Sequence, residues 1–184
     1  MNIFFLDTDT KQCAKYHCDK HVVKMILEYC QLLSTAHRVL DEDDLPDWKN
    51  EILYKSTHKN HPSSVWVRQN ARNYQYVFDL LFSLHQEYKQ RYGKNHTSWQ
   101  KLRFALCMYP MNIPLDNIRE PLCLDDAPQC MPDEYKDKST IQAYRNYYNG
   151  GKAYMAKWKN TVTPEWFKPQ LEEVSNEASS STGN

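Results

Sequence analysis

Residues 10–40 read TKQCAKYHCDKHVVKMILEYCQLLSTAHRVL, and this stretch decides the fold class. Its apolar residues recur in alternating steps of four and three, which is the period of an α-helix with one buried face. We therefore expect one long amphipathic helix from about Thr10 to Leu40. Its buried seam would contain Cys18, Val22, Met25, Tyr29, Leu32, Ala36 and Leu40.

A polar row of His17, His21, Lys24 and Glu28 runs beside this seam. At about 100° per residue these side chains fall within about 60° of one another, at the rim of the buried face. Residues at such a rim can line a cleft, where partial burial and nearby charges shift pKa values toward those useful in catalysis. The alternative is an ordinary ladder of i,i+4 contacts, with Lys24 and Glu28 paired and the histidines packed as partly apolar side chains.

Helical periodicity continues through most of the chain. We expect a short helix at residues 47–54, a second long helix at 64–92 closed by Gly93, a third from 97 or 98 to 106, a last long helix at 139–159, and one further turn from Thr163. Five prolines fall between Pro110 and Pro132, so residues 111–138 are expected to wrap irregularly over the core. The sequence predicts an all-α fold: a compact single-domain bundle of about four to five helices with a long proline-rich wrapping loop.

Composition limits the organisation and the partners. A length of 184 residues suits one domain, expected at residues 1–170, and the Ser, Glu and Asn content of 171–184 predicts a disordered tail. Basic and acidic residues number 23 each, so a site for a polyanion must be local. We expect a soluble, cytoplasmic protein without membrane contact, because the sequence lacks a signal peptide and an apolar span and its six cysteines form no Cys-x-x-Cys pair.

A second polar cluster follows residue 57 and leads into the second long helix. It combines side chains that bind phosphate, rings that stack on bases and amides that read base edges, which are the parts of a nucleic-acid site. The alternative is a solvated helix face after a satisfied loop. The candidate nucleic-acid or phosphate ligands are His58, Asn60, His61, Ser63, Trp66, Arg68, Asn70 and Asn73, with Arg145 from the last helix.

Four histidines form two closely spaced pairs, His17 with His21 and His58 with His61. Imidazole pairs at this spacing can anchor zinc or iron, so a metal site is an alternative to a cofactor-free site. The sequence contains no phosphate-binding P-loop, no Gly-rich dinucleotide turn and no Gly-x-Ser-x-Gly elbow. P-loop, dinucleotide-binding and serine-hydrolase functions are therefore unsupported.

Several landmarks occur in the order found in a known family. They are the Met1-Asn2-Ile3 start, a first helix with Ala14, His17, Lys20 and Lys24, the His61-Pro62-Ser63 start of the second helix, the segment from Met131 to Lys136, and the late Ile141-Gln142-Ala143 helix. In these features the chain resembles the phage endonuclease V type of pyrimidine-dimer DNA glycosylase, an all-helical family. The motif from His17 to Met25 also resembles one in uncharacterised proteins of marine phages and large viruses.

The resemblance implies a reaction. In the family a backbone N-terminal amine attacks the sugar C1′ and forms a Schiff base, aided by a glutamate and by arginines on the first helix. Lys20 and Lys24 stand at the places of the arginines, and His21 stands at the place of the glutamate. The bulky Asn2 favours retention of Met1, whereas the family exposes the amine of a small second residue.

We therefore expect a DNA- or nucleotide-processing enzyme that cleaves an N-glycosidic bond on a damaged or modified base; lyase activity on abasic sites is a further candidate activity. The catalytic candidates are His21, Lys24, His17, Glu28 and Lys20. Alternatives are a metal-dependent hydrolase that uses the four histidines, and a non-catalytic viral protein that binds a nucleotide or a partner. A viral protein of this kind would act in the host cytoplasm.

Overall fold

The computed structural model describes residues 1–116 and 122–169, and these residues form helices, turns and irregular segments without a β-strand. The all-α class is confirmed, and the described residues contain seven α-helices in place of four or five because two of the predicted long helices are each divided. They are α1 (Thr10–Tyr16), α2 (Asp19–Leu40), α3 (Asp47–Ile52), α4 (Pro62–Val67), α5 (Ala71–Tyr92), α6 (Thr97–Leu106) and α7 (Thr140–Asn149), with 3-10 turns η1 (Glu42–Asp44), η2 (Asp133–Tyr135) and η3 (Ala153–Met155).

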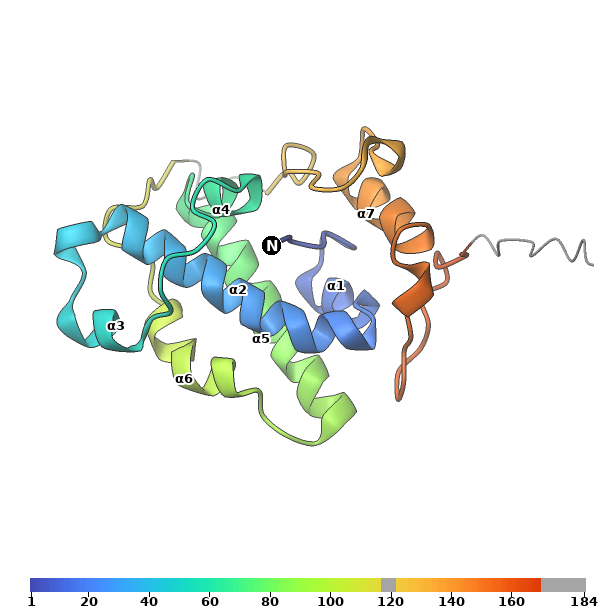
Figure 1. The fold of residues 1–184 in the computed structure, drawn as a ribbon, viewed down its shortest axis with the longest axis horizontal. Coiled ribbons are helices and arrows are strands. Elements are labelled where there is room, and N and C mark those ends of the chain that lie inside the picture. The colour runs from blue at the N-terminus through green and yellow to red at the C-terminus, as the bar shows by residue number, and fades with distance from the viewer. Residues whose placement is uncertain (117–121, 170–184) are drawn as a thin grey trace, which may run out of the picture.

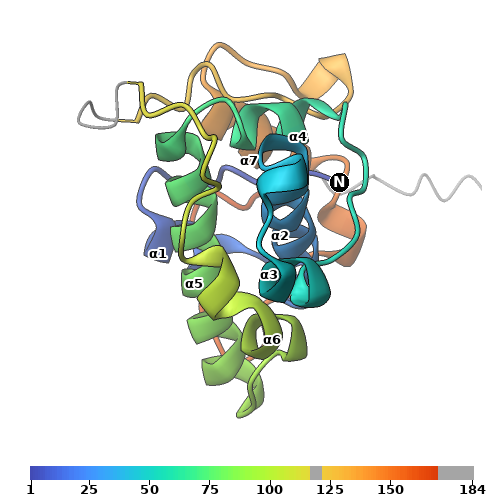
Figure 2. The ribbon, with the colours of Figure 1, turned by 90° about the vertical axis from the view of Figure 1, so that its left-hand side faces the viewer.

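The two longest helices, α2 and α5, cross at the centre of the molecule and carry most of the core (Figure 1). The predicted seam of α2 is buried from Cys18 to Ala36, and α5 contributes Tyr74, Val77, Leu81 and Leu84 to the same core. Helix α1 packs on α5, and α6 packs on α2 and α3 (Figure 2). The 3.6-residue period in the sequence thus identified the buried faces correctly.

The single helix predicted from Thr10 to Leu40 is wrong at one point. His17 and Cys18 have extended backbone, with ψ of 129° and 161°, so α1 ends before them and α2 starts after them. Arg91, from the end of α5, stabilises the break. Its guanidinium donates to the carbonyl oxygens of Lys15 and His17 at 3.0 and 2.9 Å and to Asp19 Oδ1 at 3.0 Å, which satisfies acceptors that an ended helix leaves free.

The predicted helix at residues 64–92 is likewise divided. Asn70 is extended (φ −160°) and accepts the backbone N–H of Asn73 through its side chain at 2.9 Å, so it caps a new helix, α5. The predicted end of that helix is confirmed, because Gly93 takes the left-handed conformation with φ 67°. Helix α7 ends at Asn149, ten residues before the predicted end, whereas a turn does follow Thr163, with the Phe167 N–H donating to the Pro164 carbonyl at 3.0 Å.

The irregular segment expected at 111–138 lies partly outside the described residues. In its described part Leu124, Ala127 and Met131 are buried, and Gln129 and Asp137 close a loop by two hydrogen bonds of 2.6 and 3.1 Å. The predicted tail at residues 171–184 lies outside the described residues. None of the described helices is long and apolar enough to cross a membrane.

Candidate active site at the N-terminal segment

The first residues of the chain run through the core as an extended segment. Residues 3–6 are at most 4% exposed, which fits their sequence Ile-Phe-Phe-Leu. Their backbone groups bond to side chains: Phe4 N–H donates to the Tyr29 hydroxyl at 3.2 Å, and Arg145 donates to the Leu6 carbonyl at 2.9 and 3.0 Å. Buried peptide groups need such partners. These bonds and the burial of residues 3–6 therefore hold the start of the chain between α2 and α7 (Figure 1).

Asn2 is bound from three sides. Its backbone N–H points at Glu28 Oε2 over 3.4 Å, its side-chain amide donates to the Cys130 carbonyl at 2.9 Å, and the Tyr144 hydroxyl lies 2.7 Å from its Oδ1. The same hydroxyl accepts the N–H of Cys130 at 3.2 Å. Residues from α2, from the segment before α7 and from α7 itself thus converge on the second residue of the chain.

Glu28 is the carboxylate of this site. Its side chain is 14% exposed, with Oε2 toward Asn2 and Oε1 at 3.1 Å from the Nζ of Lys24. The Lys24 side chain is 68% exposed, so this i,i+4 pair is open to solvent on the lysine side and contributes little to stability. The Glu28 carboxylate therefore lies beside the chain start, and the Lys24 ammonium lies on the solvent side of that carboxylate.

His61 and a hollow complete the site. The open hollow, of about 540 Å³, lies beside the chain start and is lined by His61, Pro62, Pro128, Gln129, Cys130, Met131, Pro132 and Tyr147. Partial burial lowers the pKa of His61, the positive charges of the chain N-terminus and of His58 lower it further, and the Glu28 carboxylate acts in the opposite direction. The α-amino group of Met1, Glu28 and His61 therefore share one electrostatic environment.

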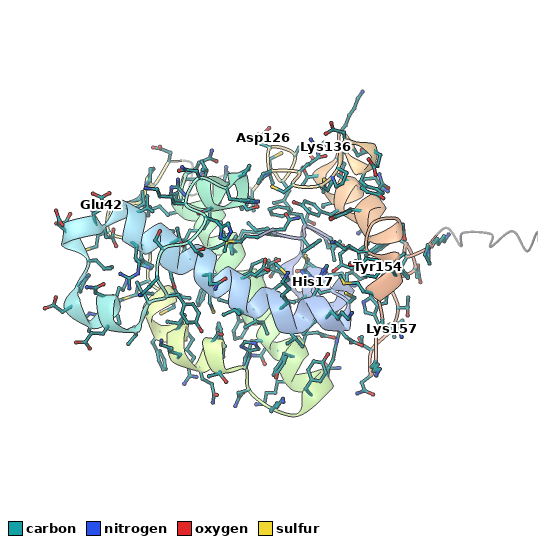
Figure 3. The ribbon with its side chains drawn as sticks, in the orientation of Figure 1. His17, Glu42, Asp126, Lys136, Tyr154 and Lys157 are labelled. Atoms are coloured by element: carbon teal, nitrogen blue, oxygen red, sulfur yellow. The ribbon has the colours of Figure 1, made fainter. Side chains whose placement is uncertain are left out.

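The other two members of the predicted row, His17 and His21, lie in the core and not at a cleft. His17 directly follows α1 (Figure 3), is fully buried, and places Nδ1 2.8 Å from the Cys13 carbonyl oxygen. His21 is 5% exposed, packs 4.2 Å from the Phe4 ring and bonds to the Tyr148 hydroxyl at 2.5 Å. Burial lowers the pKa of His17 to about 4 and that of His21 to about 2. Both rings are neutral at pH 7 and enclosed by protein.

The second predicted cluster separates into exposed and internal residues. His58 and Asn60 are exposed, and His58 has a left-handed backbone (φ 48°) with Nδ1 2.7 Å from the Thr57 hydroxyl. Ser63 is buried, with Oγ 3.5 Å from the Cys130 sulfur. These residues reach the site or its border.

The remaining members of that cluster serve the fold. Trp66 is 5% exposed and packs edge-on against Phe5 at 5.3 Å, so it does not present a ring face for a base to stack on. Asn70 caps α5, and Asn73 donates to the Trp66 carbonyl at 2.9 Å. Arg68, half-buried, donates to the Ser64 hydroxyl at 3.2 Å.

Arg145, predicted to contact nucleic acid, also faces inward. Besides Leu6 it contacts Asp7 at 3.3 Å, and its guanidinium lies over the rings of Tyr16 and Trp166 at 5.6 and 5.4 Å. Lys20 stays exposed on α2. Of the predicted binding residues, those exposed enough to meet a large ligand are therefore few.

The metal alternative loses its geometric basis. Over the described parts of the chain, no three His, Cys, Asp or Glu side chains come together in a way that could hold a metal ion. His17 and His21 lie in the core, while His58 and His61 lie at the surface near the hollow. The four histidines do not form one ligand set.

The family model for pyrimidine dimer DNA glycosylases matches residues 1–101 of the 184. The chain belongs to this family. No curated protein and no solved structure matches the chain. The matched part of the chain contains the N-terminal segment, Glu28 and His61, and it ends in α6.

The glycosylase match does not reach the residues that close the site from the other side. Cys130, Tyr144 and Tyr147 all lie beyond residue 101. No local sequence pattern indicates that Asn2 meets Cys130 and Tyr144, because these contacts join residues 128 and 142 positions apart. Membership of the family supports DNA-glycosylase function, and the structure indicates which side chains of this chain surround the N-terminus.

Proposed function

We propose that this protein cleaves the N-glycosidic bond of a pyrimidine in a DNA pyrimidine dimer and then breaks the DNA strand by a lyase step. The α-amino group of Met1 would be the nucleophile and Glu28 its acid–base partner. The observation that supports this most directly is the 3.4 Å approach of Glu28 Oε2 to the backbone nitrogen of Asn2, one residue from the amine. The family assignment supports the reaction class.

An α-amine suits the nucleophilic role better than a lysine. Only the neutral amine attacks carbon, and α-amines as a class have pKa values of about 7.7–8.0, against about 10.4 for lysine. At pH 7.5 a sizeable fraction of an ordinary α-amine is neutral, compared with roughly one part in a thousand of an ordinary lysine. An α-amine is therefore the more reactive of the two classes of amine near neutral pH.

We assign to Glu28 the role of the family's glutamate, whose place in the first helix is occupied by His21. Attack of the amine on C1′ forms a C–N bond and breaks the bond to the base, and the new ammonium passes a proton to the Glu28 carboxylate. Return of that proton to O4′ opens the sugar and leaves an iminium between Met1 and C1′. A carboxylate also stabilises positive charge that develops on the sugar ring, whereas the enclosed neutral His21 has neither the charge nor the access.

The proposed DNA contacts are local because the chain has no net charge. Lys20 and Lys24 are exposed on α2 beside the site, and Lys152 lies 4.8 Å from the Tyr147 ring on the opposite side of the chain start. His58 and Asn60 extend the same border from the loop before α4. We assign these five residues to phosphate or groove contacts. Because these cations are few, we predict that the binding constant depends weakly on salt: its logarithm should fall against the logarithm of salt concentration with a slope of about minus one for each phosphate contact.

The test uses duplex DNA with a single pyrimidine dimer, in single-turnover conditions with and without borohydride. We expect strand cleavage, a covalent adduct after reduction, and location of the adduct in the tryptic peptide from Met1 to Lys11. Glu28→Gln should slow the reaction by about 10²- to 10⁴-fold, the usual range for an acid–base residue. Lys24→Met should weaken binding and leave trapping intact.

Two results would refute this function. An adduct located in a peptide that contains Lys24 would remove Met1 from the nucleophile's role. Binding of dimer DNA without cleavage or trapping would indicate a binding protein instead of an enzyme.

A further inference from the structure

His61 occupies a place in the site that the proposed nucleophile and acid–base pair do not explain. It is half-buried, it lines the open hollow beside the chain start, and it responds to the charges of both Met1 and Glu28. Met131 and Tyr147 line the same hollow. A ligand group that enters the hollow from the reacting sugar would therefore meet the imidazole edge.

The protein fixes which ring nitrogen of His61 carries the proton. His61 is the N-cap of α4, and its Nδ1 accepts the backbone N–H of Ser63 at 3.2 Å. An N–H donor opposite Nδ1 requires a lone pair there, so the neutral ring holds its proton on Nε2. The same cap bond occupies Nδ1 permanently and leaves Nε2–H as the free edge of the ring.

Burial and the neighbouring charges together favour this neutral form. Partial burial is the largest influence and lowers the pKa of His61; the Met1 amine and His58 lower it further, and Glu28 raises it. Near neutral pH the ring is therefore a hydrogen-bond donor at Nε2 and has no free lone pair. It is unsuited to act as a base toward the amine.

We infer that His61 is a further catalytic residue, whose neutral Nε2–H donates a hydrogen bond to O2 of the departing pyrimidine. When the bond from C1′ to N1 breaks, the electron pair stays with the base and spreads from N1 onto O2. A donor at O2 stabilises that charge, His61 keeps its proton, and the base takes a proton from solvent afterwards. This inference rests on the proposed function, because it assigns a role within the same reaction.

The proposed reaction has two steps, and a hydrogen bond from His61 to the base would assist only one of them. Cleavage of the base from the sugar produces the charge on O2, whereas the lyase step on an abasic site involves no base. Loss of the donor should therefore slow only the first step. Removal of one hydrogen-bond donor to a developing oxyanion costs about 10²–10³ in rate.

The test variant is His61→Asn, which retains a side-chain oxygen able to cap α4 but is too short to reach O2. His96→Asn is the matched control, since His96 caps α6 through the same bond, from the Ser98 N–H to Nδ1 at 3.2 Å, away from the hollow. Single-turnover rates are measured on two duplexes, one with a pyrimidine dimer and one with an abasic site. Thermal unfolding of both variants checks the caps.

We expect His61→Asn to lose at least about 100-fold on the dimer and to keep its rate and its borohydride adduct on the abasic site. His96→Asn should match the wild type on both. Equal loss on both substrates would show a structural role for His61 and overturn the inference, as would full activity on both. If the wild-type protein neither cleaves nor traps either substrate, the proposed function fails and the inference fails with it.

Discussion

Replacement of Arg91 by methionine should destabilise the protein strongly. The Arg91 side chain is fully buried, and it bonds to the carboxylates of Glu87 at 2.7 Å and Asp19 at 3.0 Å and to the carbonyls of Lys15 and His17. Arg91→Met removes all four bonds and leaves the Glu87 carboxylate buried without its cation. Breaking a buried ion pair in this way costs about 3–5 kcal/mol, a large part of the roughly 5–15 kcal/mol that stabilise a domain.

Urea unfolding followed by circular dichroism measures the effect. For a slope of about 2 kcal/mol per molar urea, a loss of about 4 kcal/mol lowers the midpoint by about 2 M. The double variant Glu87→Gln with Arg91→Met should recover about 1–3 kcal/mol, because the uncompensated charge is gone. Lys89→Met, on the exposed side of the same helix, is the control and should change stability by less than about 0.5 kcal/mol. A cost below 1 kcal/mol for Arg91→Met would refute the claim that this residue holds the joint between α1 and α2.

Three further predictions concern buried groups near the site. The pKa of His21 is lowered to about 2 in the folded protein, so as pH falls below about 6.5 the unfolded chain binds this proton and the folded chain does not. Between pH 7 and pH 5 this difference should lower the free energy of unfolding by about 2 kcal/mol. His21→Gln should remove that part of the pH dependence in urea titrations, and an unchanged dependence would contradict the assignment. Gly151→Ala would place a Cβ 2.5 Å from Cε2 of Tyr147, so we expect a loss of about 1–3 kcal/mol and a lower melting temperature, and an unaltered melting temperature would show that the ring moves freely. Tyr144→Phe removes the hydroxyl 2.7 Å from Asn2 Oδ1 and should cost about 1–2 kcal/mol and reduce the yield of borohydride adduct, whereas a full yield would show that this bond does not position the amine.

The buried faces of the long helices were predictable from sequence, because burial imposes a period that a single chain displays. The seam on α2 and the cap at Gly93 are examples. The break at His17 and Cys18 was not predictable, since the residue that stabilises it, Arg91, lies 74 positions away from His17. The helical period of the apolar residues continues through residues 17 and 18 without interruption, so the sequence alone predicts a single helix there.

The candidate site was predictable in its parts and not in its arrangement. Glu28, Lys24 and His61 all carried a signal, as charged or polar residues beside an apolar seam or before a helix. Their relative importance depended on the course of residues 3–6, which enter the core and bring Asn2 to Glu28. The same course covers His21 with Phe4, which turns the most prominent sequence candidate into a core residue.

The contacts of Asn2 also set an order of events in the synthesis of the protein. Asn2 leaves the ribosome among the first residues, yet its partners Cys130 and Tyr144 follow 128 and 142 positions later. The early segment can meet Tyr29 and Trp66 as soon as α2 and α4 are made, but its bonds to Cys130 and Tyr144 close much longer loops and can form only after α7 is made. A chain that ends before α7 should therefore lack the hydrogen bonds that hold Asn2 from the side of Cys130 and Tyr144.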